Sequence, residues 1–498
     1  MMSVPTLRFI GKSQFLMHRI GTRALLLLAG SGLFWPQAHA QRRATGLTFN
    51  AEQFAAVPAL PESGGEKALT LSLRADLSAY APPAGDQGRV PACVAWATLY
   101  SAYGIQAAAR SNVADPARAR SLALSALFPY KQLRPECESG LNLHEAAAFL
   151  ARHGDVPFPD LPANACETPI GEEHRRKAAQ FRPVRDYLRL FGTTDVSDAQ
   201  KIFLVKKSID LLKAPVITGI QVWDNLSRLT EADDYYYPSR GRELLELHAV
   251  TVVGYDDGRG AFKLMNSWGP TWGQRGFFWM KYQEFAQTSV GGIILVLADP
   301  TNEISGDFGF QYLKPNASGE AIFEKTQPRH VSNGVYELNR KDWEVGQAFQ
   351  LLTRNRRSGL YMCVFSLDAE NVLNVHWPTN QKLVTYNPNL LGMNHGDLNP
   401  VANYDVTIPA KDRALYIEKP GTDRLVVLYS SKPLLDDLPR ILERVRTTPG
   451  DILTRLRAAL GSRLKTTGVS YQPSGMSFTA RAGAGDTIPM ILTIQSQP

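Results

Sequence analysis

The stretch that decides the fold lies at residues 265–273 and reads Met-Asn-Ser-Trp-Gly-Pro-Thr-Trp-Gly. It follows a β-branched run at residues 247–255, Leu-His-Ala-Val-Thr-Val-Val-Gly-Tyr, and both lie far downstream of Cys93. The thiol of Cys93, the imidazole of His248 and the amide of Asn266 are the side chains of a nucleophile, its base and a group that orients the base. A single cysteine with histidine and asparagine elsewhere in the chain is a candidate nucleophile arrangement.

The surroundings of Cys93 suit this chemistry. A helix is predicted over residues 93–109, which hold no proline and one glycine, and Pro91 suits its entry. The free N–H groups at a helix start favour a thiolate. Six residues earlier, Gln87 can aim its side-chain amide at the same point as the Cys93 backbone N–H, and two such donors make an oxyanion hole. Each residue alone has a plainer explanation in core packing or a turn. Only their joint order and spacing favours catalysis.

This pattern resembles the papain-like cysteine peptidases over residues 71–300, about half of the chain. The most specific piece is Asn-Ser-Trp-Gly-x-x-Trp-Gly from Asn266, followed by Gly276-Phe277. The resemblance implies these roles: Cys93 as nucleophile, His248 as base and acid, Asn266 as orienter, Gln87 as oxyanion donor, and Gly140 and Trp268 as residues of the substrate cleft, with Trp268 shielding the His–Asn hydrogen bond. For Gly140, an ordinary turn glycine is an equal alternative.

The match also has departures. Val90 stands where relatives carry the cysteine of a disulfide upstream of the nucleophile, and Val94 stands where they carry an aromatic residue. Neither removes a group that the mechanism needs, and together they indicate a divergent, exported bacterial branch. Residues 41–70 are too few for the long inhibitory pro-segment of many relatives. Any latency is therefore expected from another part, such as the C-terminal domain.

The expected fold class is α+β. The resemblance implies a helical left lobe and a β-barrel-like right lobe with the cleft between them, which agrees with a helix-then-strand order. Besides the helix that starts at Cys93, the sequence predicts helices over 143–153 and 199–212. Strands are predicted over 216–222, 249–255, 261–264, 276–281 and 292–297. A separate mainly-β domain with helices is expected over 305–498, including a helical stretch at 433–464 and a last strand at 488–494.

The N-terminus has the pattern of an export signal. A basic start, which contains Arg8 and Arg23, precedes an uncharged, mostly apolar run at 24–35 and the small residues around Ala40. The apolar run has 12 residues, whereas a membrane span needs roughly 20. We therefore expect a signal peptide over 1–40, cleaved near Ala40, no stable membrane anchor and a periplasmic or extracellular location. Residues 41–70 are rich in alanine, proline and glycine and are expected to be a leader or linker.

Charge and cysteine content exclude several classes of protein. Of the formal net charge of +7, the signal peptide carries four Lys/Arg and no Asp/Glu, so the mature chain would carry +3. No basic cluster beside aromatic residues indicates nucleic-acid binding. No metal or organic cofactor is expected, because thiol chemistry needs neither. Cys137 and Cys166 lie in one proline-containing stretch, and we pair them as a disulfide, with two free thiols as an equal alternative. Cys93 must stay free to act as a nucleophile.

The leading hypothesis is an exported cysteine endopeptidase that hydrolyses peptide bonds through an acyl-enzyme at Cys93. Its expected partners are a peptide or protein substrate and, through residues 305–498, an envelope or protein partner. One rival is a catalytically silent papain-like scaffold that only binds peptides. Another is a transpeptidase, in which an amine replaces water on the acyl-enzyme.

Overall fold

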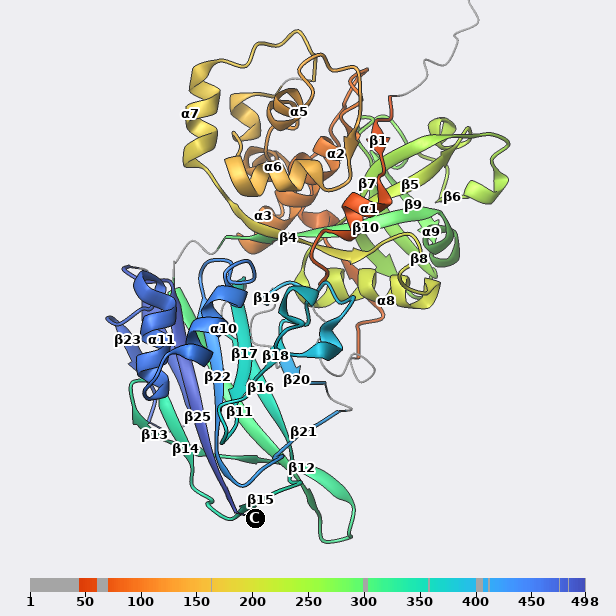
Figure 1. The fold of residues 1–498 in the computed structure, drawn as a ribbon. Coiled ribbons are helices and arrows are strands. Elements are labelled where there is room, and N and C mark those ends of the chain that lie inside the picture. Colours follow the sequence, from red (N-terminus) through yellow and green to blue (C-terminus); the bar gives the residue numbers. More distant parts are fainter. Residues whose placement is uncertain are drawn as a thin grey trace, which may run out of the picture. The chain divides into compact units, whose positions relative to one another are not determined.

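The structure is a computed structural model that describes residues 44–60, 70–162, 164–298, 303–356, 359–399, 406–410, 413–473, 475–481 and 483–497. The predicted export signal at 1–40 lies outside these ranges. Contacts group residues 43–498 into one unit. No helix in the described ranges combines the length and apolarity that crossing a bilayer requires. The fold class is α+β, as predicted, with helices first and antiparallel strands later (Figure 1).

The helix that begins at Cys93 is the central support of the first half. It is continuous from 93 to 110 as α2 (Cys93–Ala95), a π-helical segment (Trp96–Tyr103) and α3 (Gly104–Arg110), and nearly all of it is buried. Its small residues allow close packing on the sheet, where Thr251 Oγ1 donates to the carbonyl oxygen of Ala97 at 2.9 Å. The remaining helices of this half are α1 (Ala51–Ala55), α4 (Pro116–Leu122), α5 (Leu127–Leu133), α6 (Glu145–His153), α7 (Glu172–Gln180), α8 (Asp198–Lys207) and α9 (Tyr282–Thr288).

Eight strands form the sheet of this half, in the order β4-β10-β5-β7-β8-β9-β6, with β2 paired to β7. Their bounds are β2 (Arg74–Asp76), β4 (Val184–Phe191), β5 (Val216–Trp223), β6 (Tyr235–Tyr236), β7 (Leu244–Asp256), β8 (Ala261–Met265), β9 (Phe277–Lys281) and β10 (Ser289–Leu297). All five predicted strands are present, whereas β2, β4 and β6 were not predicted. Figure 1 shows α2, α5, α6 and α7 grouped together beside the strands β5, β7, β8 and β9. This is the expected helical and β-rich division.

Residues 303–497 form two further sheets. The first has the order β20-β16-β11-β24-β23, with β12 on β11 and β21 on β16; the second has the order β13-β14-β25-β22-β17-β18, with β15 on β25 and β19 on β17. The bounds are β11 (Glu303–Pro315), β12 (Ala321–Thr326), β13 (Pro328–Ser332), β14 (Val335–Leu338), β15 (Trp343–Glu344), β16 (Ala348–Asn355), β17 (Leu360–Leu367), β18 (Leu373–Trp377), β19 (Leu398–Asn399), β20 (Val406–Ile408), β21 (Leu415–Tyr416), β22 (Gly421–Ser430), β23 (Val469–Tyr471), β24 (Met476–Arg481) and β25 (Thr487–Gln497).

Strand alternation explains how these two sheets are covered. Met362 and Val364 of β17 share a core with Phe308 and other side chains of the first sheet. The residues between them, such as Cys363, point to the opposite face and join a core with the helices α10 (Leu438–Thr447) and α11 (Ile452–Leu460). Because successive side chains of a strand point to opposite faces, one strand serves both cores. The mainly-β organisation with helices matches the prediction.

Candidate active site

Cys93 is the first residue of α2 and is fully buried in this conformation. Its Sγ accepts a hydrogen bond from the backbone N–H of Ala249 at 3.4 Å, so the sulfur lies against the residue that follows His248. Burial raises the pKa of the Cys93 thiol to about 12, although nearby backbone N–H groups oppose the shift. The helix start and β7 therefore place the sulfur, but its covered position keeps it protonated.

His248 and Asn266 come together as the sequence predicted. His248 Nε2 lies 2.7 Å from Asn266 Oδ1, and Nδ1 is buried with no hydrogen-bond partner among the described residues. The Trp268 ring lies 4.8 Å from the imidazole, between centroids, at an angle of 31°. Trp268 thus covers one face of the imidazole, as a shield for its hydrogen bond requires. The Asn266 contact fixes which ring nitrogen remains free to exchange a proton.

The charges at the site follow from its burial. Burial lowers the pKa of His248 to about 4, and the hydrogen bond that the imidazole donates to Asn266 opposes this only in part. Near pH 7 the imidazole and the Cys93 thiol are therefore both neutral in this conformation. A thiolate and an imidazolium would stabilise one another, but separating charge in a fully buried site is costly. Water must enter before the sulfur becomes a strong nucleophile.

Gln87 lies in the same buried cluster. Its Oε1 accepts from Ser267 Oγ at 2.6 Å, and its Nε2 donates to the carbonyl oxygens of Val90 at 3.1 Å and Thr45 at 3.3 Å. The amide predicted to hold an oxyanion is therefore occupied by a carbonyl of the chain itself. Ser267, which lies between Asn266 and Trp268 in the opening motif, was missed by the sequence analysis. Its position between two site residues was the available signal.

One of these two carbonyls, that of Thr45, belongs to the leader, defined here as the described residues 44–60. Trp268 Nε1 donates to the carbonyl oxygen of Ala44 at 2.9 Å. Residues Leu47–Thr48 form β1, which pairs in parallel with β3 (Leu141–Asn142). The leader thus contacts both sides of the site. The leader therefore contacts the site although it is short, whereas the sequence analysis expected any latency to come from another part of the chain.

Gly140 and Gly46 meet backbone to backbone. A Cβ on Gly140 would lie 2.0 Å from the carbonyl oxygen of Gly46, and a Cβ on Gly46 would lie 2.1 Å from that of Pro91. Gly46 also has φ of +139°, a region that other residues rarely adopt. Gly140 therefore permits a close backbone approach, and the segment that approaches it is the leader.

Residues 84–292 match the family model described as "Papain family cysteine protease". The matched segment contains Cys93, His248, Asn266 and Gln87 in the geometry given above. Residues 84–292 are a papain-family cysteine protease domain.

The relatives of this papain-family domain are distant. Cysteine proteinase 3 of Dictyostelium discoideum is 23% identical over 54% of this chain and 70% of its own length. An uncharacterized peptidase C1-like protein of Acanthamoeba polyphaga mimivirus is 26% identical over 26% of this chain, and the match spans 42% of its own length. Among solved structures, xylellain, a cysteine protease from Xylella fastidiosa, is 20% identical with a TM-score of 0.41, over 51% of this chain and 97% of that one.

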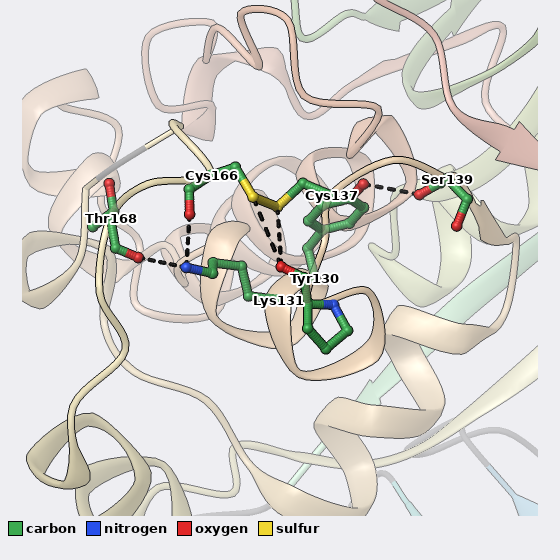
Figure 2. Close-up of a disulfide and its surroundings, with 7 residues drawn as sticks. Tyr130, Lys131, Cys137, Ser139, Cys166 and Thr168 are labelled. Carbon is green, nitrogen blue, oxygen red and sulfur yellow. Dashed lines mark hydrogen bonds between the residues drawn. A yellow bond between two sulfur atoms is a disulfide. The ribbon is translucent and has the colours of Figure 1, made fainter.

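The cleft wall of the papain-family domain carries the disulfide. Cys137 and Cys166 are bridged, with Cα atoms 6.1 Å apart, and Cys93 and Cys363 are free. Figure 2 shows Lys131 beside the bridge; its Nζ donates to the carbonyl oxygen of Cys166 at 2.7 Å. Tyr130 donates its hydroxyl hydrogen to the carbonyl oxygen of Ser139 at 2.8 Å. The bridge and these bonds fix the short loop that presents Gly140.

Within the described ranges, no cluster of three or more His, Cys, Asp or Glu side chains is placed to hold a metal ion.

Proposed function

We propose that this chain is an exported cysteine endopeptidase that cleaves peptide bonds through a thioester at Cys93. The observation that carries the proposal is the contact of His248 Nε2 with Asn266 Oδ1 at 2.7 Å, which leaves Nδ1 as the proton-exchanging atom. The sulfur of Cys93 lies against the next residue, Ala249. The nucleophile, base and orienter therefore occupy one buried cluster.

The reaction proceeds in two halves. In the first, the Cys93 proton passes to His248 Nδ1, the sulfur attacks the substrate carbonyl carbon, and the C–N bond breaks as Nδ1 returns the proton to the leaving amine. In the second, His248 takes a proton from water, the hydroxide oxygen attacks the thioester, and the C–S bond breaks to release the acid and restore the thiol. The Gln87 amide and the Cys93 N–H stabilise the oxyanion in both halves.

Substrate can reach the sulfur only after the leader moves. Cys93, His248 and Gln87 are each 0% exposed in this conformation, and the Gln87 amide already binds Thr45. The structure thus corresponds to a closed state. Once the leader leaves, water enters, burial no longer opposes charge, and the thiolate–imidazolium pair becomes accessible.

Export is the second part of this proposal. Its support is the signal-like composition of residues 1–40 and the Cys137–Cys166 disulfide, which suits an oxidising compartment. N-terminal sequencing of the mature protein from its native host tests it, and a start shortly after Ala40 is expected. A mature protein that still begins at Met1 in the cytosol would contradict it.

The test of the reaction compares the wild-type chain with Cys93→Ala. Peptide turnover and labelling by a thiol-directed epoxide should both be lost in Cys93→Ala, while the circular dichroism spectrum is kept. A chain that labels at Cys93 but never turns over a fluorogenic peptide library, even with the cleft opened by Gly46→Val, is the silent scaffold. Ligated product on addition of an amine would indicate transfer in place of hydrolysis.

A further inference from the structure

The leader is fastened at a second place, away from the cleft. Beyond α1, the backbone N–H of Arg189 in β4 donates to the carbonyl oxygen of Pro58 at 2.8 Å, and the N–H of Leu60 donates to the carbonyl oxygen of Arg189 at 2.7 Å. Residues 58–60 therefore extend the edge of the papain-family sheet. The backbone of this short extended segment is thus hydrogen-bonded to β4 along one edge.

The opposite edge of residues 58–60 is hydrogen-bonded to the C-terminal region. The N–H of Ala59 donates to the carbonyl oxygen of Asn394 at 3.1 Å, and the N–H of Gly396 donates to the carbonyl oxygen of Ala59 at 3.5 Å. The side-chain amide of Asn394 also donates to the carbonyl oxygen of Ala55, the last residue of α1, at 2.8 Å. The leader therefore lies between β4 and the segment Asn394–Gly396, which we name the latch loop.

The latch loop is itself held firmly. Thr379 Oγ1 lies 2.6 Å from His395 Nδ1, and Asn380 donates its side-chain amide to the carbonyl oxygen of His395 at 2.9 Å. The N–H of His395 donates to the carbonyl oxygen of Thr379 at 3.1 Å. These bonds tie the loop to the segment that follows β18. The loop therefore offers the leader a preformed partner, and little additional ordering is needed for the two to bind.

We propose that the latch loop of the C-terminal region holds the leader in the papain-family cleft and so controls access to Cys93. The proposal concerns the regulation of the proposed active site and rests on that function. The two fastenings act on one short segment, because α1 alone lies between the cleft residues 44–50 and the latched residues 55–60. Holding one end of a short tether keeps the other at a high effective concentration beside its site. Loss of the latch should therefore raise the fraction of open clefts.

The C-terminal region also binds β4 without touching the leader. Arg185 donates to the carbonyl oxygens of Gly359 at 2.6 Å and Ser431 at 3.1 Å, and the Tyr361 hydroxyl contacts Asp186 Oδ2 at 3.3 Å. These contacts permit a comparison in which attachment of the region is weakened while the latch loop is unchanged.

The test measures the rate at which iodoacetamide alkylates Cys93 in the full-length chain. Gly396→Leu places a side chain against Pro58, whose Cβ lies 3.1 Å from the position of a Cβ on residue 396. Asn394→Ala removes the amide that donates to Ala55. We expect alkylation to accelerate by about tenfold in Gly396→Leu and less in Asn394→Ala. The matched control is Leu391→Ala, which changes a side chain that is 77% exposed near the latch loop and should leave the rate unchanged.

Two results would overturn the proposal. One is an unchanged rate in both latch variants when Gly46→Val, which disturbs the leader directly, is alkylated fast. The other is an equal acceleration in Arg185→Ala, which would assign control to attachment of the whole region. If Gly396→Leu fails to fold, as judged by its circular dichroism, Asn394→Ala decides alone. Fast alkylation of the latch variants without any peptide turnover would support the latch proposal and contradict the proposed peptidase activity.

Discussion

The papain-family domain and the C-terminal region each hold a buried cysteine and a histidine with a lowered pKa, yet only one pair has the neighbours that chemistry needs. Cys363 is 0% exposed within β17, and burial raises its pKa as it does that of Cys93. Burial also lowers the pKa of His376 to about 4, as it does for His248. A shifted pKa therefore does not separate the two regions. The difference lies in the partners of each group.

Cys93 begins a helix in a site that the leader contacts, whereas Cys363 lies in mid-strand, where it is paired with Leu428 of β22. The nitrogen of His376 lies 2.9 Å from Ser366 Oγ, a hydroxyl, while His248 has the amide of Asn266. A removable cover, an orienting amide and a second amide donor distinguish a candidate active site from an ordinary core. Four experiments test this contrast.

The largest effect is expected at the two cysteines. Cys93→Ala should lower kcat/KM for a peptide substrate by a factor on the order of 10⁴ or more, because the attacking atom is gone. Cys363→Ala should keep activity and reduce the free energy of unfolding by about 1 kcal/mol, since it leaves a small cavity. Steady-state kinetics and urea unfolding of both variants measure this. Equal losses of activity would erase the distinction between the two regions.

The second-largest effect is expected at the side chains that contact the two histidines. Asn266→Ala leaves His248 without its partner and should lower kcat by a factor on the order of 10². Ser366→Ala removes the corresponding partner of His376 and should leave kcat unchanged. The pH profile of kcat is the deciding readout for Asn266→Ala, because its acid limb should shift if the asparagine acts through the imidazole. An unchanged pH profile of kcat in Asn266→Ala would indicate that Asn266 only packs in the site and does not act through the imidazole.

The third-largest effect is expected from a change in the leader at Gly46. Gly46→Val cannot keep its backbone at φ of +139° without strain and would press on Pro91, so the leader should leave the cleft. Alkylation of Cys93 should accelerate by about tenfold or more, since such strain costs about 1–3 kcal/mol. Gly319→Val is the matched control, because Gly319 also has a positive φ but nothing lies near it. A similar acceleration in Gly319→Val would show that the leader does not control access to Cys93.

The smallest effect is a dependence of stability on pH. Both histidines have folded-state pKa values of about 4, below the ordinary 6.5, so the unfolded chain binds more protons between these values. Stability should therefore fall as the pH drops through this window, by about 1 kcal/mol per histidine between pH 7 and 5.5. His248→Gln and His376→Gln should each remove their own share, measured as the difference from wild type in urea unfolding. No difference at either pH would show that the histidines are solvated.

Much of the fold was predictable because its signals are local. The runs around Val216, Ala249 and Ala261 are short, rich in β-branched or aromatic residues and separated by turn residues, and each became a strand that covers its predicted limits. The site could be assembled in advance because three separate motifs shared one chemistry. The structure brings Cys93, His248, Asn266 and Gln87 into one cluster, although their catalytic roles stay proposals.

The missed elements depend on distant partners. β4 carries Arg185, Asp186 and Arg189, whose charges obscure its alternation, and two of these side chains contact residues more than 170 positions away. Residues 41–70 were expected to be a leader or linker because their composition lacks periodicity. The leader's seat combines buried side chains such as Leu47 and Phe54 with a backbone contact between Gly46 and Gly140, and such a backbone contact leaves no pattern in side-chain type.

The backbone of the leader has a practical consequence for the search for ligands. At residue 46 it takes a conformation that an ordinary L-peptide avoids, so a substrate must follow the cleft along a different path. Residues 44–50 are therefore a poor template for a substrate library and a better starting point for a blocking peptide. A synthetic copy of this segment should compete with alkylation of an opened cleft without being hydrolysed, and its cleavage would show that the two paths coincide.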